Sequence, residues 1–355
     1  MAETASANRD HRARQMLDAF TNTNLHLIIL PTEQCNFRCV YCYEDFSVGT
    51  MSPPVVAGVK RLLAERVPDL RNLHIAWFGG EPLLALGVIR EISARATELA
   101  GACGTGYRGE MTTNGYRLDA RTARELHDLG IRHYQVTLDG PPAYHDRTRV
   151  RRDGGGSFER IWGNLVALRD SDLPISLNLR IHVNPTNLAV MPGFLAEVKR
   201  EFLGDRRFTI MLKPVGRWGG PNDDTLAVLE GDDRRTVAPR LTAQVLEDLS
   251  EDAEFHPDDV CYASRPNSFV IRASGEVGKC TVALADPANT IGRLREDGSL
   301  EVKNDALQPW LRGWSTDPDA LGCPLIGLPR GAGEPVLLQI GARPGTRRAD
   351  ARDGV

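Results

Sequence analysis

Long apolar runs and an excess of basic residues are both missing from this sequence of 355 residues. The apolar runs that it does have are too short to cross a bilayer, so we expect no association with a membrane. The first residues, MAETASANRDHRARQ, contain no apolar stretch and are unlike a secretory signal. A net charge of −4, from 43 basic and 47 acidic residues, argues against nucleic acid as a partner. The expectation is a globular, cytoplasmic protein.

Cysteine is scarce as well, at seven residues, and an odd number cannot pair completely within one chain. In a chain without an export signal, cysteines serve metal or redox chemistry more often than a disulfide framework. The segment 340–355 is rich in arginine and glycine, and we expect it to be a disordered tail. The cysteines are therefore the first place to look for a functional site.

Strand-like and helix-like segments alternate along most of the chain. Six segments are predicted as strands of one sheet, namely 25–31, 73–78, 107–114, 133–138, 175–183 and 207–213. A predicted helix follows five of them directly, the first entered through Pro53 and Pro54 and the third ending at Gly130. Six β–α units in a row predict an α/β fold with a parallel sheet, which can curve into a partial (β/α)6 barrel. In such barrels the functional groups follow the carboxyl ends of the strands.

The character of the chain changes after the sixth predicted strand. A segment rich in glycine and aspartate, 216–233, precedes one more predicted helix, and short strands and turns begin at about residue 256. We predict four parts, an N-terminal extension, the barrel, a smaller second module and the tail, with bounds 1–24, 25–235, 255–335 and 340–355.

Three of the cysteines, Cys35, Cys39 and Cys42, lie in one loop directly after the first predicted strand, with the spacing C-x3-C-x2-C. Thiolate is the usual ligand of iron–sulfur clusters, so three thiolates suit three irons of a four-iron cluster and leave the fourth iron free. A structural zinc ion is the rival, but it would want four ligands. His26 or His74 could supply the fourth ligand, although neither has the usual local spacing.

This cysteine spacing, with the aromatic Tyr41 before the last cysteine, resembles the radical S-adenosylmethionine (SAM) superfamily. The resemblance implies a partial (β/α)6 barrel, which agrees with the six units above. It also implies a [4Fe–4S] cluster whose free iron binds SAM. An electron from the cluster then cleaves SAM, and the resulting 5′-deoxyadenosyl radical takes hydrogen from a substrate.

Three further motifs follow predicted strands and resemble motifs of the same family, FGGEP at 78–82, TTNG at 112–115 and TLDG at 137–140. The resemblance implies that they line the SAM side of the barrel, and Arg180 could bind the SAM carboxylate. The implied cofactor-binding residues are Gly79, Gly80, Glu81, Pro82, Asn114, Thr137, Asp139 and Arg180. The alternative for each motif is a simple turn after a strand.

Two more stretches are open to a functional or a structural interpretation. In HDRTR, 145–149, His145 and Asp146 could form an acid–base pair, or the loop could tie down the glycine-rich turn that follows. The residues Lys213, Arg217 and Trp218 follow the sixth predicted strand and could face a substrate.

A second set of cysteines, Cys261, Cys280 and Cys323, lies in the predicted second module. Cys261 and Cys280, with Gly275 between them, resemble the opening of the SPASM and twitch modules, which carry auxiliary clusters. The sequence then departs from that pattern, because most of the later cysteines are missing. One auxiliary iron–sulfur cluster is the favoured reading, with zinc or a module without metal as alternatives. Its fourth ligand is open between Cys103, Glu334, an Asp or His at 256–259, and substrate.

The resemblance implies an enzyme, most often one that modifies a ribosomally made precursor peptide by a crosslink, a thioether or an epimerisation. Expected partners are a reductant such as flavodoxin or ferredoxin, the precursor peptide, and a separate leader-binding protein, because only about 24 residues precede the first predicted strand. The alternatives are a radical SAM dehydrogenase or epimerase of a small molecule, and a non-catalytic iron–sulfur protein that transfers electrons or senses redox state.

Overall fold

The fold was obtained as a computed structural model, which describes residues 17, 19–246, 260–311 and 323–328. Most of the predicted extension, 1–24, and the whole predicted tail, 340–355, lie outside the described residues. The same holds for Glu334 and for residues 256–259, so those candidate ligands have no structural account.

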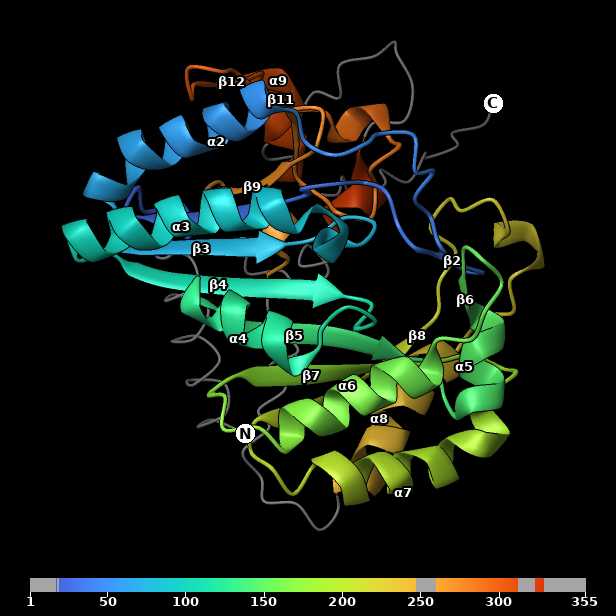
Figure 1. The fold of residues 1–355 in the computed structure, drawn as a ribbon. Helices are drawn as coiled ribbons and strands as arrows, with labels where there is room; N and C mark the ends of the chain where they lie inside the picture. The colour runs from blue at the N-terminus through green and yellow to red at the C-terminus, as the bar shows by residue number, and fades with distance from the viewer. Residues whose placement is uncertain (1–16, 18, 247–259, 312–322, 329–355) are drawn as a thin grey trace, which may run out of the picture.

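A ten-stranded sheet forms the centre of the molecule, and six of its strands are the ones predicted from the sequence. They are β1 (Asn24–Ile29), β3 (Asn72–Trp77), β4 (Gly106–Thr113), β5 (Ile131–Leu138), β7 (Ser176–Val183) and β8 (Phe208–Pro214). Each pairs with the next in parallel. In Figure 1 the tips of β3, β4 and β5 point the same way. The α/β fold with a parallel sheet is confirmed.

Helices connect these strands. The longer ones are α2 (Pro53–Arg66), α3 (Leu86–Cys103), α4 (Ala120–Asp128), α6 (Phe158–Arg169), α7 (Met191–Phe202) and α8 (Asp233–Leu246). Proline stands at the start of α2, where its missing N–H costs nothing, as predicted. Gly130 has a φ of 80° just beyond α4, which confirms the predicted left-handed residue after this helix.

The two faces of the sheet differ in composition because successive side chains of a strand point to opposite sides. In β1, Leu25, Leu27 and Ile29 belong to the main apolar core together with residues of the helices. The alternate residues of β1 face the other way, where Ile28 joins a smaller apolar cluster that also contains Ala76. This second, inner face also carries polar side chains, and it is the face on which the sites below are built.

The last four strands continue the same sheet, which was not predicted. They are β9 (Ser268–Ile271), β10 (Glu276–Gly278), β11 (Gly292–Leu294) and β12 (Leu300–Val302), followed by the short helix α9 (Asn304–Leu307). The first of them, β9, pairs in parallel with β1, and each later strand adds on in antiparallel fashion. The predicted second module is therefore hydrogen-bonded to the first strand of the barrel.

A separate two-stranded sheet holds the cysteine loop and was also not predicted. It pairs β2 (Phe37–Cys39) with β6 (Arg149–Arg151) in antiparallel fashion, and α5 (Pro142–Thr148) leads into β6. The register places Cys39 opposite Arg149. In Figure 1 this small sheet lies beyond the tips of the parallel strands. Among the described residues, none of the helices combines the length and the apolar character that crossing a membrane would need.

Candidate active site

The thiols of Cys35, Cys39 and Cys42 line one cavity of about 430 Å³ at the carboxyl ends of the parallel strands. All three side chains are partly buried. The backbone N–H of Phe37 donates to Cys35 Sγ over 3.3 Å, so the loop turns a donor toward the first thiol. The loop thus presents three sulfur donors to one space, as the predicted cluster requires.

The predicted motif FGGEP approaches the backbone of the cysteine loop so closely that side chains would not fit. A Cβ on Gly79 would lie 2.4 Å from the carbonyl oxygen of Thr32, and a Cβ on Gly80 would lie 2.5 Å from that of Gln34. Gly79 also has a φ of +112°, which favours glycine. Both glycines line the cavity. Their small size therefore serves the close packing of two loops as well as any ligand.

Glu81 is fully buried, and its hydrogen bonds connect the ends of two neighbouring strands. Its carboxylate accepts hydrogen bonds from Thr113 Oγ1 at 2.7 Å, from Asn114 N at 2.7 Å and from Leu83 N at 3.0 Å. Burial raises the pKa of this carboxyl group. Glu81 and Pro82, which begins a short 3₁₀ helix (Pro82–Ala85), lie outside the cavity lining. The amine-binding role of Glu81 stays a prediction, whereas its role in joining β3 to β4 is visible.

Asn114 lies where β4 ends and connects this strand to the cysteine loop. Its side-chain amide donates to Asn36 Oδ1 over 2.8 Å, and the residue lines the cavity beside Cys35. The turn interpretation of this motif also holds, because Asn114 Oδ1 accepts from the N–H of Tyr116. Asn114 can therefore serve the turn and face the cavity at once.

Asp139, just after β5, is buried at the centre of a polar network behind the cavity. Its Oδ1 accepts from Tyr41 O–H at 3.1 Å, its Oδ2 from Thr148 Oγ1 at 2.6 Å, and His182 Nδ1 lies 3.2 Å from Oδ1. Burial alone would raise the pKa of Asp139, but His182 and then Arg149 hold it well below its usual range. Asp139 therefore anchors the cysteine loop from behind, and contact with SAM remains a prediction for it.

Arg149 supplies a buried positive charge beside the thiols. Its guanidinium donates to Tyr41 Oη over 2.8 Å, while its Nε is buried without a hydrogen-bond partner among the described residues. Burial raises the pKa of Cys39, and Arg149 is the main opposing influence. Burial likewise raises the pKa of Cys42 to about 12. Because thiolates are the metal-ligating form, this cation stabilises the form that a cluster needs.

Thr137 and Arg180 line the cavity from neighbouring strands, and their contact with SAM stays a prediction. The register places them side by side on β5 and β7, and Arg180 Nε donates to His182 Nε2 over 3.0 Å. Lys213 and Trp218 also line it. Arg217 lies outside this cavity lining, and its guanidinium donates to the carbonyl oxygens of Asp223 and Leu226 in the following loop, so a contact with substrate stays a prediction for it.

In the HDRTR segment, 145–149, the hydrogen bonds of His145 and Asp146 fit the structural interpretation. Asp146 Oδ1 accepts from the N–H groups of Ser157 and Phe158 at 2.7 and 2.9 Å, where the glycine-rich turn enters α6. His145 is fully buried, with Nδ1 accepting from Asp139 N and Nε2 bonded to Ser157 Oγ. The loop therefore ties down the turn.

The second set of cysteines also comes together. Burial is the main influence that raises the pKa of the Cys261 thiol, and the nearby thiols of Cys280 and Cys323 raise it further. Asn289 fixes Cys280, because its Oδ1 accepts from Cys280 N and its Nδ2 donates to Cys280 O. Cys103 is an exposed residue at the end of α3. These three thiols could therefore ligate an auxiliary cluster, and the metal and its fourth ligand remain predictions.

The spacing of the thiols bears on zinc. A tetrahedral zinc ion with Zn–S bonds of about 2.3 Å would hold its sulfur ligands within about 4 Å of one another. Within the described residues, neither cysteine trio brings its three sulfur atoms within 4.8 Å of one another. A cluster of several irons needs wider spacing, so the donor set fits a cluster better than a single zinc ion.

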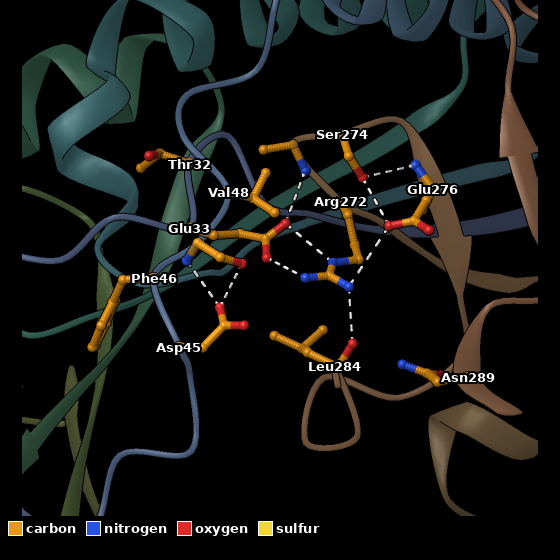
Figure 2. A network of polar contacts seen from close by, with 12 residues as sticks. Thr32, Glu33, Asp45, Phe46, Val48, Arg272, Ser274, Glu276, Leu284 and Asn289 are labelled. Atoms are coloured by element: carbon orange, nitrogen blue, oxygen red, sulfur yellow. Dashed lines mark hydrogen bonds and ion pairs between the residues drawn. The ribbon is translucent and has the colours of Figure 1, made fainter. Parts of the chain in front are cut away.

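An ion pair joins the two parts of the chain at the start of the cysteine loop. Arg272, which follows β9, places its guanidinium against both carboxylate oxygens of Glu33, with Nε–Oε1 at 3.1 Å and Nη2–Oε2 at 2.5 Å. Figure 2 shows Arg272 between Glu33, Glu276 and the carbonyl oxygen of Leu284. Glu33 is 2% exposed. The C-terminal strands therefore help to fix the loop that carries Cys35.

Sequence reasoning did not identify Arg149, His182 or Glu33 as site residues. Arg149 ends the HDRTR segment, and His182 lies two residues after Arg180 on the same face of β7. Their positions next to candidate residues were the only indication in the sequence that they belong to the site. Glu33 lies two residues before Cys35, but its partner is more than two hundred residues away in the chain.

One family model matches the part of the chain that carries this cavity. Residues 29–194 match the family model of the Radical SAM superfamily. A GTP 3′,8-cyclase of Rhodopseudomonas palustris is 33% identical over 172 residues, which is 46% of each chain. The chain thus spans about half the length of the curated relatives it matches.

Two solved structures share the fold. Native anSMEcpe with bound AdoMet and the Kp18Cys peptide has a TM-score of 0.61 at 18% identity, covering 81% of this chain and 84% of that one. Streptococcus suis SuiB bound to precursor peptide SuiA has a TM-score of 0.55 at 13% identity, covering 87% and 70%. The cavity and its three thiols fit the [4Fe–4S] cluster and SAM that this fold family implies. Residues 29–194, the part of the chain that carries the three thiols, are therefore similar to the Radical SAM superfamily.

Proposed function

We propose that the protein is a radical SAM enzyme that abstracts hydrogen from a ribosomally made precursor peptide. The observation that carries the radical SAM part is the convergence of three thiols, two glycines and Arg180 on one cavity. A cluster held by the three thiols would supply the electron for reductive cleavage of SAM. The remaining tasks of the protein are to bind and orient SAM and the substrate, and to shield the reaction from solvent.

The chain's own residues divide these tasks. Gly79 and Gly80 expose backbone groups at the cavity wall, where the amino acid part of SAM would hydrogen-bond. Arg180 offers a planar guanidinium for the SAM carboxylate. Arg149 and Asp139 hold Tyr41 at the back of the loop, so the position of the thiols is fixed before any ligand binds.

The peptide assignment draws its support from the walls of the cavity and from the fold. Tyr43, Phe78 and Trp218 line the cavity, and Trp218 is 42% exposed at the surface. Aromatic side chains offer large contact areas at low entropic cost, which suits an extended peptide. Both structures of the same fold reported above hold peptides. A reductant such as flavodoxin or ferredoxin, and a separate leader-binding protein, are the partners we propose with this substrate.

A small anionic molecule is the second candidate substrate, and the charges in the cavity favour it. Lys213 and Arg180 both line the cavity, and neither forms an ion pair with a carboxylate in the part of the chain that the structure describes. If Arg180 binds SAM, Lys213 remains for a substrate carboxylate or phosphate. Dehydrogenation or epimerisation of such a molecule is the alternative reaction. A non-catalytic electron carrier would not need a polar cavity beside its cluster.

One experiment separates these functions. The full chain, reconstituted anaerobically with iron and sulfide, is incubated with SAM and reductant, and 5′-deoxyadenosine is measured. An enzyme forms it, whereas a non-catalytic iron–sulfur protein with intact clusters does not. Co-expression with a short cysteine- or aromatic-rich peptide encoded beside the gene, followed by mass spectrometry, tests the substrate class. A mass change in the peptide supports the proposal; 5′-deoxyadenosine formation with an unchanged peptide favours the small-molecule alternative.

A further inference from the structure

Two histidines and a glutamate meet on the inner face of the sheet, on three neighbouring strands. His26 lies on β1, His74 on β3 and Glu110 on β4, and one ligand atom from each lies within 4.8 Å of the others. The imidazole rings of His26 and His74 stack with centroids 4.4 Å apart. His74 Nε2 lies 2.9 Å from Glu110 Oε2.

The strand register explains why these residues meet. His26 is the direct neighbour of His74, and neighbouring strands are about 4.8 Å apart. Glu110 pairs with Ala76, one step further along the same face than His74, and its longer side chain reaches back to the imidazole. The arrangement rests on paired backbone in the middle of the sheet and not on a loop.

His26 is held by one ring nitrogen and leaves the other without a partner. Its Nδ1 is 2.9 Å from Ser268 Oγ on β9, and Ser268 is 1% exposed. Its Nε2 is buried and has no hydrogen-bond partner among the described residues. A buried polar atom without a partner is costly, so such an atom in a folded protein needs an explanation, and a bound ion or water is one.

We propose that His26, His74 and Glu110 form a binding site for one divalent transition metal ion of the zinc type. Two imidazoles and one carboxylate are a ligand set that zinc and related ions use at sites with an open position. The bond between Ser268 and His26 Nδ1 is the kind of outer contact that orients a histidine ligand. Such a site is separate from both cysteine trios and does not depend on the proposed substrate.

The open position of such an ion would face a cavity. Two of the three ligands, His26 and Glu110, line a cavity of about 330 Å³ on the inner face. Phe78, Thr112 and Gln135 line both this cavity and the one at the cysteine loop. The ion would therefore take water, or a carbonyl or carboxylate oxygen of a molecule that reaches in from the active-site side.

Arg108 competes with the metal for Glu110. Its guanidinium lies 3.5 Å from Glu110 Oε2, but its side chain is 57% exposed, so solvent screens much of this interaction. The competition lowers the affinity without removing the site. Binding is therefore best tested with zinc in the micromolar range and not by asking what survives purification.

The test uses the full chain with its iron–sulfur clusters in place, with zinc as the probe. The wild type, His26→Gln and Glu110→Gln are compared with His133→Gln, a histidine of the same cavity outside the trio. Zinc bound at micromolar free zinc is measured by equilibrium dialysis, beside iron and sulfide. We expect about one zinc per chain in the wild type and in His133→Gln, and binding weakened about 100-fold or more in the other two.

X-ray absorption at the zinc edge of the wild type tests the proposal without any variant. The expected spectrum has only nitrogen and oxygen neighbours at about 2.0–2.1 Å, with imidazole scattering. Sulfur neighbours at about 2.3 Å would place the zinc at the cysteines and overturn the proposal. Equal zinc binding at equilibrium by the wild type and by correctly folded His26→Gln would overturn it as well, leaving the trio a hydrogen-bonded cluster only.

Discussion

The carboxylate of Glu33 and the guanidinium of Arg272 form a buried, two-point ion pair that joins the cysteine loop to the C-terminal strands. Glu33 lies two residues before Cys35, and Arg272 follows β9, which pairs with β1. The backbone N–H of Ala273 donates to the same carboxylate over 3.3 Å. The position of the first thiol therefore depends on a segment far away in the chain.

Replacing Arg272 with alanine should destabilise the protein strongly. Glu33 would stay buried without its counter-charge, and removing one partner of a buried pair costs about 3–5 kcal/mol. We expect a lower free energy of unfolding in denaturant and faster loss of iron. The control is Arg295→Ala, which breaks a pair with Glu301 whose side chains are 51% and 55% exposed, and should cost less than about 1 kcal/mol. Equal effects of the two variants would show that the Glu33 pair has no special role.

Glu81→Gln should be more harmful than its small change in shape suggests. The carboxylate accepts three hydrogen bonds, and an amide would turn its NH2 group toward one of these donors. A buried donor left unsatisfied costs about 1–3 kcal/mol, and we expect weaker SAM binding because β3 and β4 lose their connection. Thr113→Val removes one of the three bonds and is expected to cost about 1 kcal/mol. Chemical denaturation measures the stability of each variant, and SAM titration measures its affinity for SAM. A Glu81→Gln variant with wild-type stability would refute the role of Glu81 in connecting β3 to β4.

Arg149→Met should make the cluster at Cys35, Cys39 and Cys42 harder to reduce. Losing a buried positive charge beside Cys39 disfavours the added electron, so the reduction potential should fall by tens of millivolts. An EPR-monitored redox titration measures the change. Arg151→Met is the matched control, because this arginine of the same strand pairs with Asp153 and, unlike Arg149, is not part of the cavity lining. An unchanged potential in Arg149→Met would mean that the cation does not act on the cluster.

His145 should make stability depend on pH below neutrality. Burial, then Arg149, lowers its pKa from the ordinary 6.5 to about 4, so the unfolded chain binds more protons than the folded one between these values. Stability is thus retained above pH 6.5 and falls toward pH 4, by about 3 kcal/mol at about 1.4 kcal/mol per pH unit. Urea unfolding between pH 7 and 5 should show a shallower loss in His145→Asn than in the wild type. Parallel curves would contradict this.

The sequence was informative where structure follows from local pattern. The parallel strands β1, β3, β4, β5, β7 and β8 were predictable because runs of apolar residues alternate with helical periodicity. Parallel strands bring their carboxyl ends to one edge, so the motifs after β1, β3 and β4 could be expected to meet.

Pairings between distant segments were not predictable. The strands β9 to β12 are three or four residues long, too short for a periodic signal that shows which strand they pair with. The position of Arg149 follows from the pairing of β2 with β6, and that of Arg272 from the pairing of β9 with β1. The same applies to His26, His74 and Glu110, whose meeting depends on register across three strands.

The formation of 5′-deoxyadenosine tests the central claim most directly. The reconstituted wild type should convert SAM to 5′-deoxyadenosine and methionine under reducing, anaerobic conditions. The variant with Cys35, Cys39 and Cys42 replaced by alanine should form none, while one with Cys103 replaced should behave as the wild type. Absence of 5′-deoxyadenosine from a wild-type sample with intact clusters and bound SAM, or undiminished formation in the triple variant, would contradict the account.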